Sequence, residues 1–152
     1  MANMWTDSQT AVTENRVFQI SDYVTLTYAD GTEDIATATR RLICTVPAYS
    51  LITRVFYHVV TDFDAATNDY LTVGSATDDD ILVDDADVSS GSANTPIVAV
   101  VQATTLPYYI AADTPIYASY VYSSTAPSAG EVQVAIEWVP WSPVEVKTTL
   151  VG

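Results

Sequence analysis

The feature that most constrains this chain is the apolar run LITRVFYHVVT at residues 51–61, which contains neither Gly nor Pro. Its β-branched and aromatic side chains are typical of one long β-strand. A polar stretch follows at residues 62–69, where Asp and Asn suit a turn because their side chains bond to the local backbone. Residues 70–74, YLTVG, then begin a second strand. We therefore predict a hairpin formed by these two strands.

The long strand also predicts where the middle of the fold lies. By strict alternation, Ile52 and Phe56 share one face with Arg54 and His58, and the odd-numbered residues from 51 to 61 share the other. Neither face is clearly polar. This pattern predicts a central strand that is covered on both sides.

Other strand-like segments follow one another at short spacing. They lie at residues 16–20, 23–28, 41–46, 97–102, 107–111, 116–122 and 131–139, with a last extended segment at 144–151. The cleanest alternation places Val132, Val134, Ile136 and Trp138 on one side of their strand. Residues 75–95 are acidic and irregular, and no segment carries a helical stripe with caps. We predict an all-β, single-domain, jelly-roll-like β-sandwich.

The first residues differ from the rest of the chain. Residues 1–15 are polar, lack strand alternation and carry the isolated aromatic Trp5. We predict an N-terminal arm at residues 1–15 and a sandwich domain at residues 16–152, one domain being the expectation for 152 residues. The start of the chain has no basic region followed by an apolar core, and no apolar run is long enough to span a bilayer. These features predict a soluble protein made in a cytoplasm.

The charge balance limits the possible partners. Five Lys and Arg stand against 19 Asp and Glu, for a formal net charge of -14. Such a surface is repelled by phosphate backbones and by anionic lipid, so we predict no nucleic-acid partner and no membrane partner. A hydrophobic fraction of 49% argues against a disordered chain.

The inventory of reactive side chains argues against catalysis. Cys44 and His58 are the only residues of their types, so a structural zinc site lacks its ligands and no intrachain disulfide can form. The alternation around Cys44 favours a buried, inert thiol, and His58 lies in the middle of a strand. Five glycines form no phosphate-binding loop. We predict that the protein is not an enzyme and has no catalytic residues, no metal site and no cofactor.

One acidic cluster remains as a candidate cation site. Three aspartates precede the short apolar insert at residues 81–83 and three follow it: Asp78, Asp79, Asp80, Asp84, Asp85 and Asp87. Carboxylates at this spacing can converge on Ca²⁺, but the spacing does not match an EF-hand loop. A solvated acidic loop is the preferred interpretation. A second cluster in the turn, formed by Asp62, Asp64 and Asp69, is weaker.

Aromatic residues allow three readings. The chain has ten Tyr and three Trp, with tyrosines concentrated at positions 108, 109, 117, 120 and 122. They can stack on sugar rings, fill the core or contact another protein. The sequence leaves these three uses open.

Several stretches resemble a class of small virion proteins from tailed bacteriophages. ITRVF and VVTDFD at residues 52–64, followed by YLTVG at 70–74, are similar to the strand, Asp/Asn turn and L-T-V-G segment of that class. YIAADTPIYA at residues 109–118 resembles a strand entry, and SAGEVQV at 128–134 resembles the final strand. The resemblance implies a jelly-roll head decoration (cement) protein that binds the outside of the capsid and stabilises the shell.

A head decoration protein is expected to have particular partners and contact residues. Packaged DNA fills the inside of a capsid, so a chain of net charge -14 is better placed outside it. We expect the major capsid protein as partner, and a homo-oligomer with a trimer first and a dimer second, since attachment points lie near symmetry axes. Trp5 with its arm and Trp141 are the predicted partner-binding residues. The alternative is a glycan-binding module, such as a receptor-binding tail component.

Overall fold

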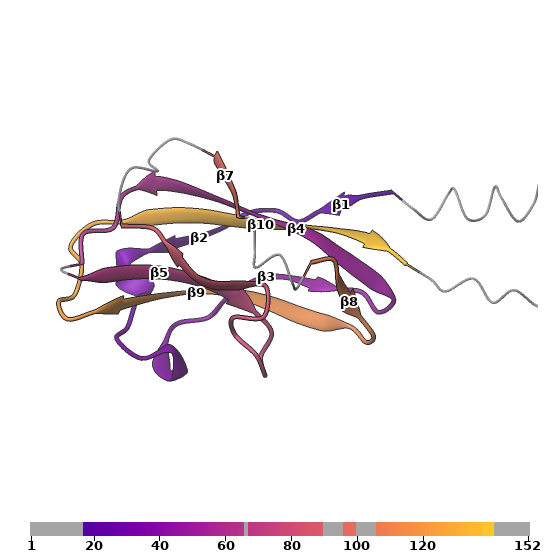
Figure 1. Cartoon of the computed structure of the whole chain (residues 1–152), viewed down its shortest axis with the longest axis horizontal. Coiled ribbons are helices and arrows are strands. Elements are labelled where there is room, and N and C mark those ends of the chain that lie inside the picture. Colours follow the sequence, from indigo (N-terminus) through magenta and orange to yellow (C-terminus); the bar gives the residue numbers. More distant parts are fainter. Residues whose placement is uncertain (1–16, 66, 90–95, 100–105, 142–152) are drawn as a thin grey trace, which may run out of the picture.

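Two antiparallel β-sheets packed face to face make up the protein (Figure 1). The computed structural model describes residues 17–65, 67–89, 96–99 and 106–141. Helical structure in these residues is limited to two 3₁₀ turns, η1 (Tyr28–Asp30) and η2 (Ile35–Thr37). The strands are β1 (Gln19–Ile20), β2 (Val24–Thr27), β3 (Arg41–Val46), β4 (Ser50–Thr61), β5 (Asn68–Gly74), β6 (Val83–Asp87), β7 (Pro96–Ala99), β8 (Tyr108–Ile110), β9 (Thr114–Ser123) and β10 (Glu131–Pro140).

The strand order identifies the architecture. In the first sheet β10 pairs with β1 and β2 on one side and with β4 on the other, and both β7 and β8 pair with the far edge of β4. The second sheet has the order β3-β9-β5-β6. When β1 with β2 and β7 with β8 are each counted as one interrupted strand, the sheets read 1-8-3-6 and 2-7-4-5. This is the strand order of a jelly roll, and the predicted all-β sandwich is confirmed.

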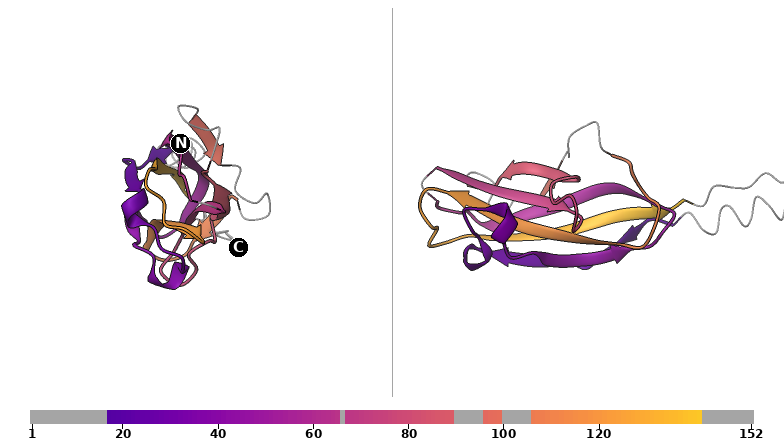
Figure 2. Two further views of the ribbon diagram at one scale, coloured as in Figure 1. Left: turned by 90° about the vertical axis from the view of Figure 1, so that its left-hand side faces the viewer. Right: turned by 90° about the horizontal axis from the view of Figure 1, so that it is seen from below.

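The core lies between the two sheets, and the long strands run lengthwise along it (Figure 2). The predicted alternation of β10 is confirmed for Val132, Val134 and Ile136, which are fully buried. The pairing of β10 with β4 shifts register between Glu137 and Trp138, and beyond this bulge Val139 is the buried side chain. A bulge therefore ends the regular alternation at Trp138, which is only partly buried against the core.

The predicted hairpin is wrong, although both of its strands exist. β4 belongs to the first sheet and β5 to the second, where β5 pairs with β9 and β6. The connection between them crosses from one sheet to the other, and Phe63 points into the core on the way. Its ring packs against Tyr120 of β9 with centroids 4.2 Å apart. A buried aromatic inside the turn thus favours a change of sheet over a return to the same sheet.

The same bulge between Glu137 and Trp138 also changes the faces of β4. Arg54 pairs with Glu137 and Ile52 with Trp138, so Thr53 is an extra residue on β4. As a result Ile52 is buried in the core, whereas Phe56 lies on the partly covered outer face. The prediction that Ile52 and Phe56 share a face is wrong, because strict alternation fails across a bulge.

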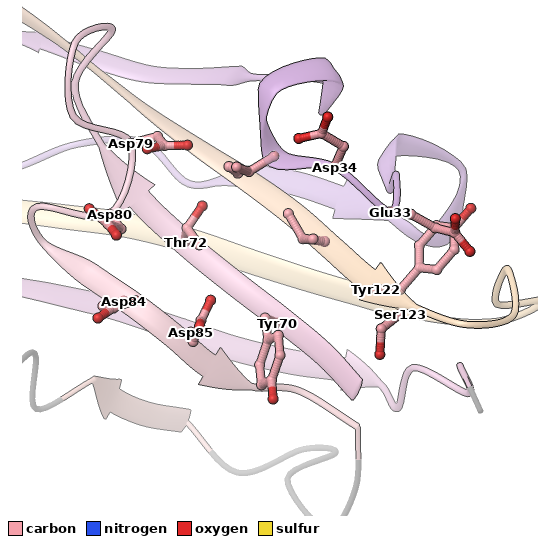
Figure 3. Close-up of a pocket in the computed structure, with 12 residues that line it drawn as sticks. Glu33, Asp34, Tyr70, Thr72, Asp79, Asp80, Asp84, Asp85, Tyr122 and Ser123 are labelled. Atoms are coloured by element: carbon pink, nitrogen blue, oxygen red, sulfur yellow. The ribbon is translucent and has the colours of Figure 1, made fainter. Parts of the chain in front are cut away.

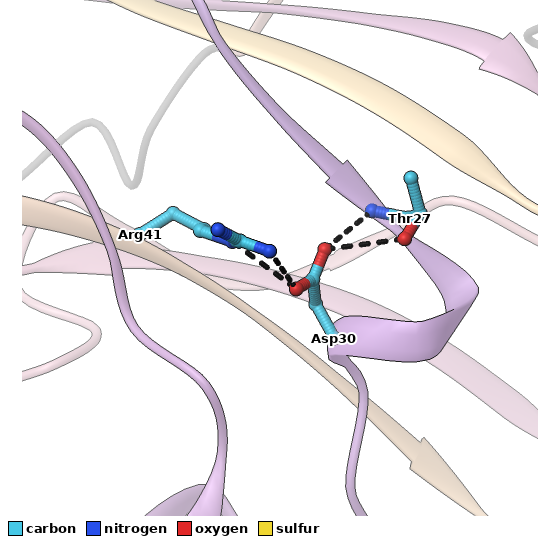
Figure 4. Close-up of polar contacts among 3 residues, drawn as sticks. All are labelled: Thr27, Asp30 and Arg41. Atoms are coloured by element: carbon cyan, nitrogen blue, oxygen red, sulfur yellow. Dashed lines mark hydrogen bonds and ion pairs between the residues drawn. The ribbon is translucent and has the colours of Figure 1, made fainter.

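A buried carboxylate fixes η1 to the second sheet (Figure 4). Asp30 accepts hydrogen bonds from the Thr27 backbone N–H at 2.9 Å and from Arg41 Nε at 3.1 Å. Burial alone would raise the pKa of Asp30, but the Thr27 N–H and the Arg41 guanidinium together lower it below its usual 3.8. The loop between β2 and β3 is therefore held against the sandwich by a charged contact.

Candidate functional site

β1 and the end of β10 lie at the same end of the sandwich (Figure 1). Three exposed aromatic residues belong to the loops and strand ends that are joined there. Tyr49, Tyr109 and Trp141 are 55%, 43% and 42% exposed. The Trp141 N–H donates to the Tyr49 carbonyl at 2.6 Å, and the Tyr49 N–H donates to the Ile110 carbonyl at 2.7 Å. We call these three residues the aromatic end. The two hydrogen bonds join the backbone segments to which they belong.

The loop that carries Tyr49 is held in an unusual conformation. Tyr49 has φ 59°, in the left-handed region that non-glycine residues rarely adopt. The Ala48 N–H donates to the Asp113 side chain at 2.8 Å, which joins this loop to the one between β8 and β9. Left-handed backbone at a bulky residue costs energy and persists only where its surroundings hold it. Tyr49 is therefore presented by a constrained loop.

An apolar edge continues from the aromatic end. Gln19 of β1 pairs with Trp138, so the first described residues lie beside the last ones. Along this edge Val17, Phe18, Ile20 and Tyr23 are all more than half exposed. Large exposed apolar groups that lie together mark interaction sites. The structure thus places Trp141 in an apolar, exposed setting, while Trp5 lies outside the described residues.

The outer face of the second sheet carries a hollow of about 460 Å³ (Figure 3). We call it the acidic groove, because six carboxylates line it and its lining contains no Lys, Arg or His. The lining consists of Glu33, Asp34, Ile35, Tyr70, Thr72, Asp79, Asp80, Asp84, Asp85, Val121, Tyr122 and Ser123.

A bulge in β6 brings two neighbouring carboxylates into this groove. Val73 pairs with Val83 and Leu71 with Ala86, so Asp84 and Asp85 together stand opposite the single residue Thr72. In a regular strand adjacent side chains point to opposite faces, but the bulge lets both aspartates line the groove. Asp85 adopts φ 50° at this point. β6 was not predicted from the sequence, because its run of aspartates hides the strand pattern.

The loop before β6 folds back over β5 at Gly74. The Ser75 N–H donates to the Asp78 carbonyl at 2.7 Å, and the Leu82 N–H donates to the Val73 carbonyl at 2.9 Å. A Cβ on Gly74 would lie 2.2 Å from the Asp78 oxygen, so only glycine permits this approach. One carboxylate oxygen from each of Asp78, Asp79 and Asp80 lies within 4.8 Å of the others.

Crowding of these carboxylates disfavours their ionised forms. A hydrogen bond with Asp78 is the largest influence that raises the pKa of Asp80, with burial and the charges of neighbouring aspartates adding to it. Burial and then the charge of Asp84 raise the pKa of Asp85. The acidic loop is folded, with Asp78 and Asp80 exposed to solvent, and its carboxylates repel one another.

Other predicted candidates have structural roles. Burial raises the pKa of the Cys44 thiol to about 11, so it carries no thiolate at neutral pH. Asp64 accepts hydrogen bonds from Ser128 and from the Ala129 N–H, which joins two loops. Asp69 is fully buried and accepts a hydrogen bond from the Tyr120 hydroxyl.

The tyrosines divide between core and surface. Tyr120 is fully buried, and Tyr108 and Tyr122 pack against the core from partly buried positions. Tyr109 belongs to the aromatic end, and Tyr122 also lines the acidic groove with Tyr70. Most of this set is therefore not a flat, exposed sugar-binding platform.

Fold and surface together define a jelly-roll β-sandwich with an exposed aromatic end and an acidic outer groove. No described helix is long and apolar enough to cross a membrane. Comparisons with protein families and with curated proteins find no match. Among solved structures, the chain is similar to one from the cyanophage Pam1 capsid asymmetric unit, with a TM-score of 0.61 and 20% identity over 82% of this chain and 86% of that one. At this identity the similarity shows a shared fold.

Proposed function

We propose that the protein is a structural, non-enzymatic component of a bacteriophage virion, and that it decorates the outer surface of the head. The observation that carries this proposal is the similarity to a chain of a phage capsid asymmetric unit, which extends over most of both chains. The sequence stretches that resemble small phage virion proteins support it independently, at residues 52–74, 109–118 and 128–134.

The charge of the protein supports an exterior position. A net charge of -14 opposes contact with packaged DNA, whose phosphates would repel it. Of the three described arginines, Arg41 pairs with Asp30, Arg54 lies 3.7 Å from Glu137, and Arg40 donates to the Ala76 carbonyl. The described surface therefore offers little positive charge to a nucleic acid.

We place the contact with the major capsid protein at the aromatic end. Trp141 and Tyr109 supply large, amphipathic side chains of the kind that dominate interface energies. Trp5, in the arm proposed for residues 1–15, would join them, because the chain enters the described sandwich beside Trp141. A protein that binds the assembled shell but not free subunits stabilises the shell by linkage.

We also propose that the protein acts as a symmetric homo-oligomer, with a trimer first and a dimer second. Capsid attachment points near symmetry axes favour closed assemblies of identical subunits. The exposed apolar residues of the β1–β2 edge give such an assembly a surface to bury.

Cosedimentation with shells that lack the protein tests the proposal. We expect saturable binding by the full chain, and binding weakened about tenfold or more by Trp141→Ala or Tyr109→Ala. Tyr28→Ala is the matched control, because Tyr28 is 44% exposed, close to the 43% of Tyr109, and lies on η1 outside the aromatic end. Equal loss for Tyr28→Ala and Tyr109→Ala would reject the aromatic end as the contact surface.

A glycan-binding module is the second candidate function. It is favoured by one observation, the presence of Tyr70 and Tyr122 beside carboxylates in the acidic groove. Absence of shell binding, together with retention on a glycan surface that Tyr70→Ala abolishes, would replace the decoration proposal with this one.

A further inference from the structure

A buried hydroxyl without a partner lies at the centre of the acidic groove. Thr72 is 4% exposed, and its Oγ1 has no hydrogen-bond partner among the described residues. Such a group costs free energy unless something satisfies it. Figure 3 shows its side chain projecting into the groove, with Asp79 and Asp80 to one side and Asp85 to the other.

Carboxylates from two elements, the loop after Gly74 and β6, lie around Thr72. The bulge of β6 sets Asp84 and Asp85 opposite it. The loop that crosses Gly74 brings Asp79 and Asp80 to the same groove. Oxygen atoms on one Ca²⁺ lie at about 2.3–2.6 Å from the ion, so they are within about 5 Å of one another. Asp78, Asp79 and Asp80 of the loop meet that requirement, because one carboxylate oxygen of each lies within 4.8 Å of the others.

We propose that the acidic groove binds a divalent cation, Ca²⁺, with Thr72 Oγ1 and carboxylates of Asp78, Asp79 and Asp80 as ligands. Asp84 and Asp85 of the β6 bulge stand opposite Thr72 and add negative charge. All these donors are hard oxygens, which Ca²⁺ prefers. An irregular arrangement from a loop and a bulge suits the variable coordination of Ca²⁺ better than the strict octahedron of Mg²⁺.

A bound cation would also offset the negative charge of the groove. Six carboxylates line it, and its lining includes no basic side chain. Arg40 contacts the neighbouring loop at the Ala76 carbonyl, at 3.0 Å, and not a carboxylate. A bound divalent ion would offset this negative charge and would join the loop to Thr72 of β5. The site does not depend on the virion role proposed above.

Calorimetric titration of the full chain with CaCl₂ tests the site, after EDTA treatment and at an ionic strength of about 0.15 M. We expect one saturable Ca²⁺ site per chain, weaker binding of MgCl₂, and a higher melting temperature with Ca²⁺. Asp79→Asn should weaken Ca²⁺ binding about tenfold or more. Asp22→Asn is the matched control, because it removes the same charge from an exposed loop of the other sheet.

Thr72→Val tests whether the Thr72 hydroxyl is a ligand or whether Ca²⁺ is attracted only by the acidic surface. Valine keeps the shape and removes the unsatisfied hydroxyl, so the Ca²⁺-free protein should fold at least as well as the parent. We expect this variant to lose Ca²⁺ affinity about tenfold while retaining its melting temperature. Unchanged Ca²⁺ affinity in Thr72→Val, equal loss in Asp22→Asn, or a melting shift that KCl of the same ionic strength reproduces would each overturn the proposal.

Discussion

The contact between Tyr120 and Asp69 yields the sharpest prediction about stability. Both residues are fully buried, and the Tyr120 hydroxyl donates to the Asp69 carboxylate. Within the described residues, the Ala65 N–H also donates to this carboxylate, at 3.1 Å. Tyr120→Phe would keep the ring, whose centroid lies 4.2 Å from that of Phe63, and remove only the hydroxyl.

The expected loss follows from leaving a buried carboxylate short of one donor. A hydrogen bond to a charged group contributes about 1.5–3 kcal/mol, and we expect Tyr120→Phe to lower the free energy of unfolding by that amount. For a chain of this size, that loss corresponds to a fall in melting temperature of about 3–12 °C. The packing of the ring contributes nothing to this difference, because it is retained.

Equilibrium unfolding in urea at pH 7, with thermal melting alongside, measures the effect. Tyr122→Phe is the matched control, because its ring lies 6.2 Å from that of Tyr120 and its hydroxyl makes no hydrogen bond within the described residues. It should change the free energy of unfolding by less than about 0.5 kcal/mol. Combining Tyr120→Phe with Asp69→Asn should show a coupling of about 1 kcal/mol or more. Equal effects of Tyr120→Phe and Tyr122→Phe would refute the reasoning.

Two further predictions concern the loops that close the sandwich. Gly130 has φ 143°, and a Cβ there would lie 2.2 Å from the Phe63 ring, so Gly130→Ala should cost about 2–4 kcal/mol in urea unfolding; a change below about 0.5 kcal/mol would contradict this packing. Because the pKa of Asp30 is lowered in the folded state, its stabilisation should be present above pH 3.8 and lost as the pH falls through the folded value. Stability curves of the parent and Asp30→Asn, measured from pH 7 to pH 2, should therefore converge only at acidic pH, and a constant gap would reject the ionic contribution.

The strands were predictable because their signal is local. β4, β9 and β10 combine β-branched residues with alternation, and each of them has its pattern within a dozen residues of sequence. Their pairing was harder to predict, because the choice between a hairpin and a change of sheet depends on where Phe63 packs. In the sequence, Phe63 lies within a polar stretch that predicts a turn. Its contact with Tyr120 shows that this stretch passes from one sheet to the other beside the core.

The candidate sites could likewise be predicted only in part from the sequence. Trp141 was predictable as an exposed aromatic after the last clean strand, but its grouping with Tyr49 and Tyr109 depends on backbone hydrogen bonds between residues far apart in the chain. The aspartates at positions 78–85 were visible, whereas Thr72 was not a candidate in the sequence. The bulge that sets two aspartates opposite Thr72 has no signature in a run of acidic residues.

The two surfaces lie on different parts of the sandwich, and this separation has a consequence for docking. The aromatic end and the apolar β1–β2 edge belong to one end and to the first sheet, whereas the acidic groove opens on the outer face of the second sheet. A partner that covers Trp141 would therefore leave the groove facing solvent. Ca²⁺ would then neutralise and stiffen the exposed face without competing for the contact surface, so loss of Ca²⁺ should lower the stability of the protein while leaving Trp141 able to bind.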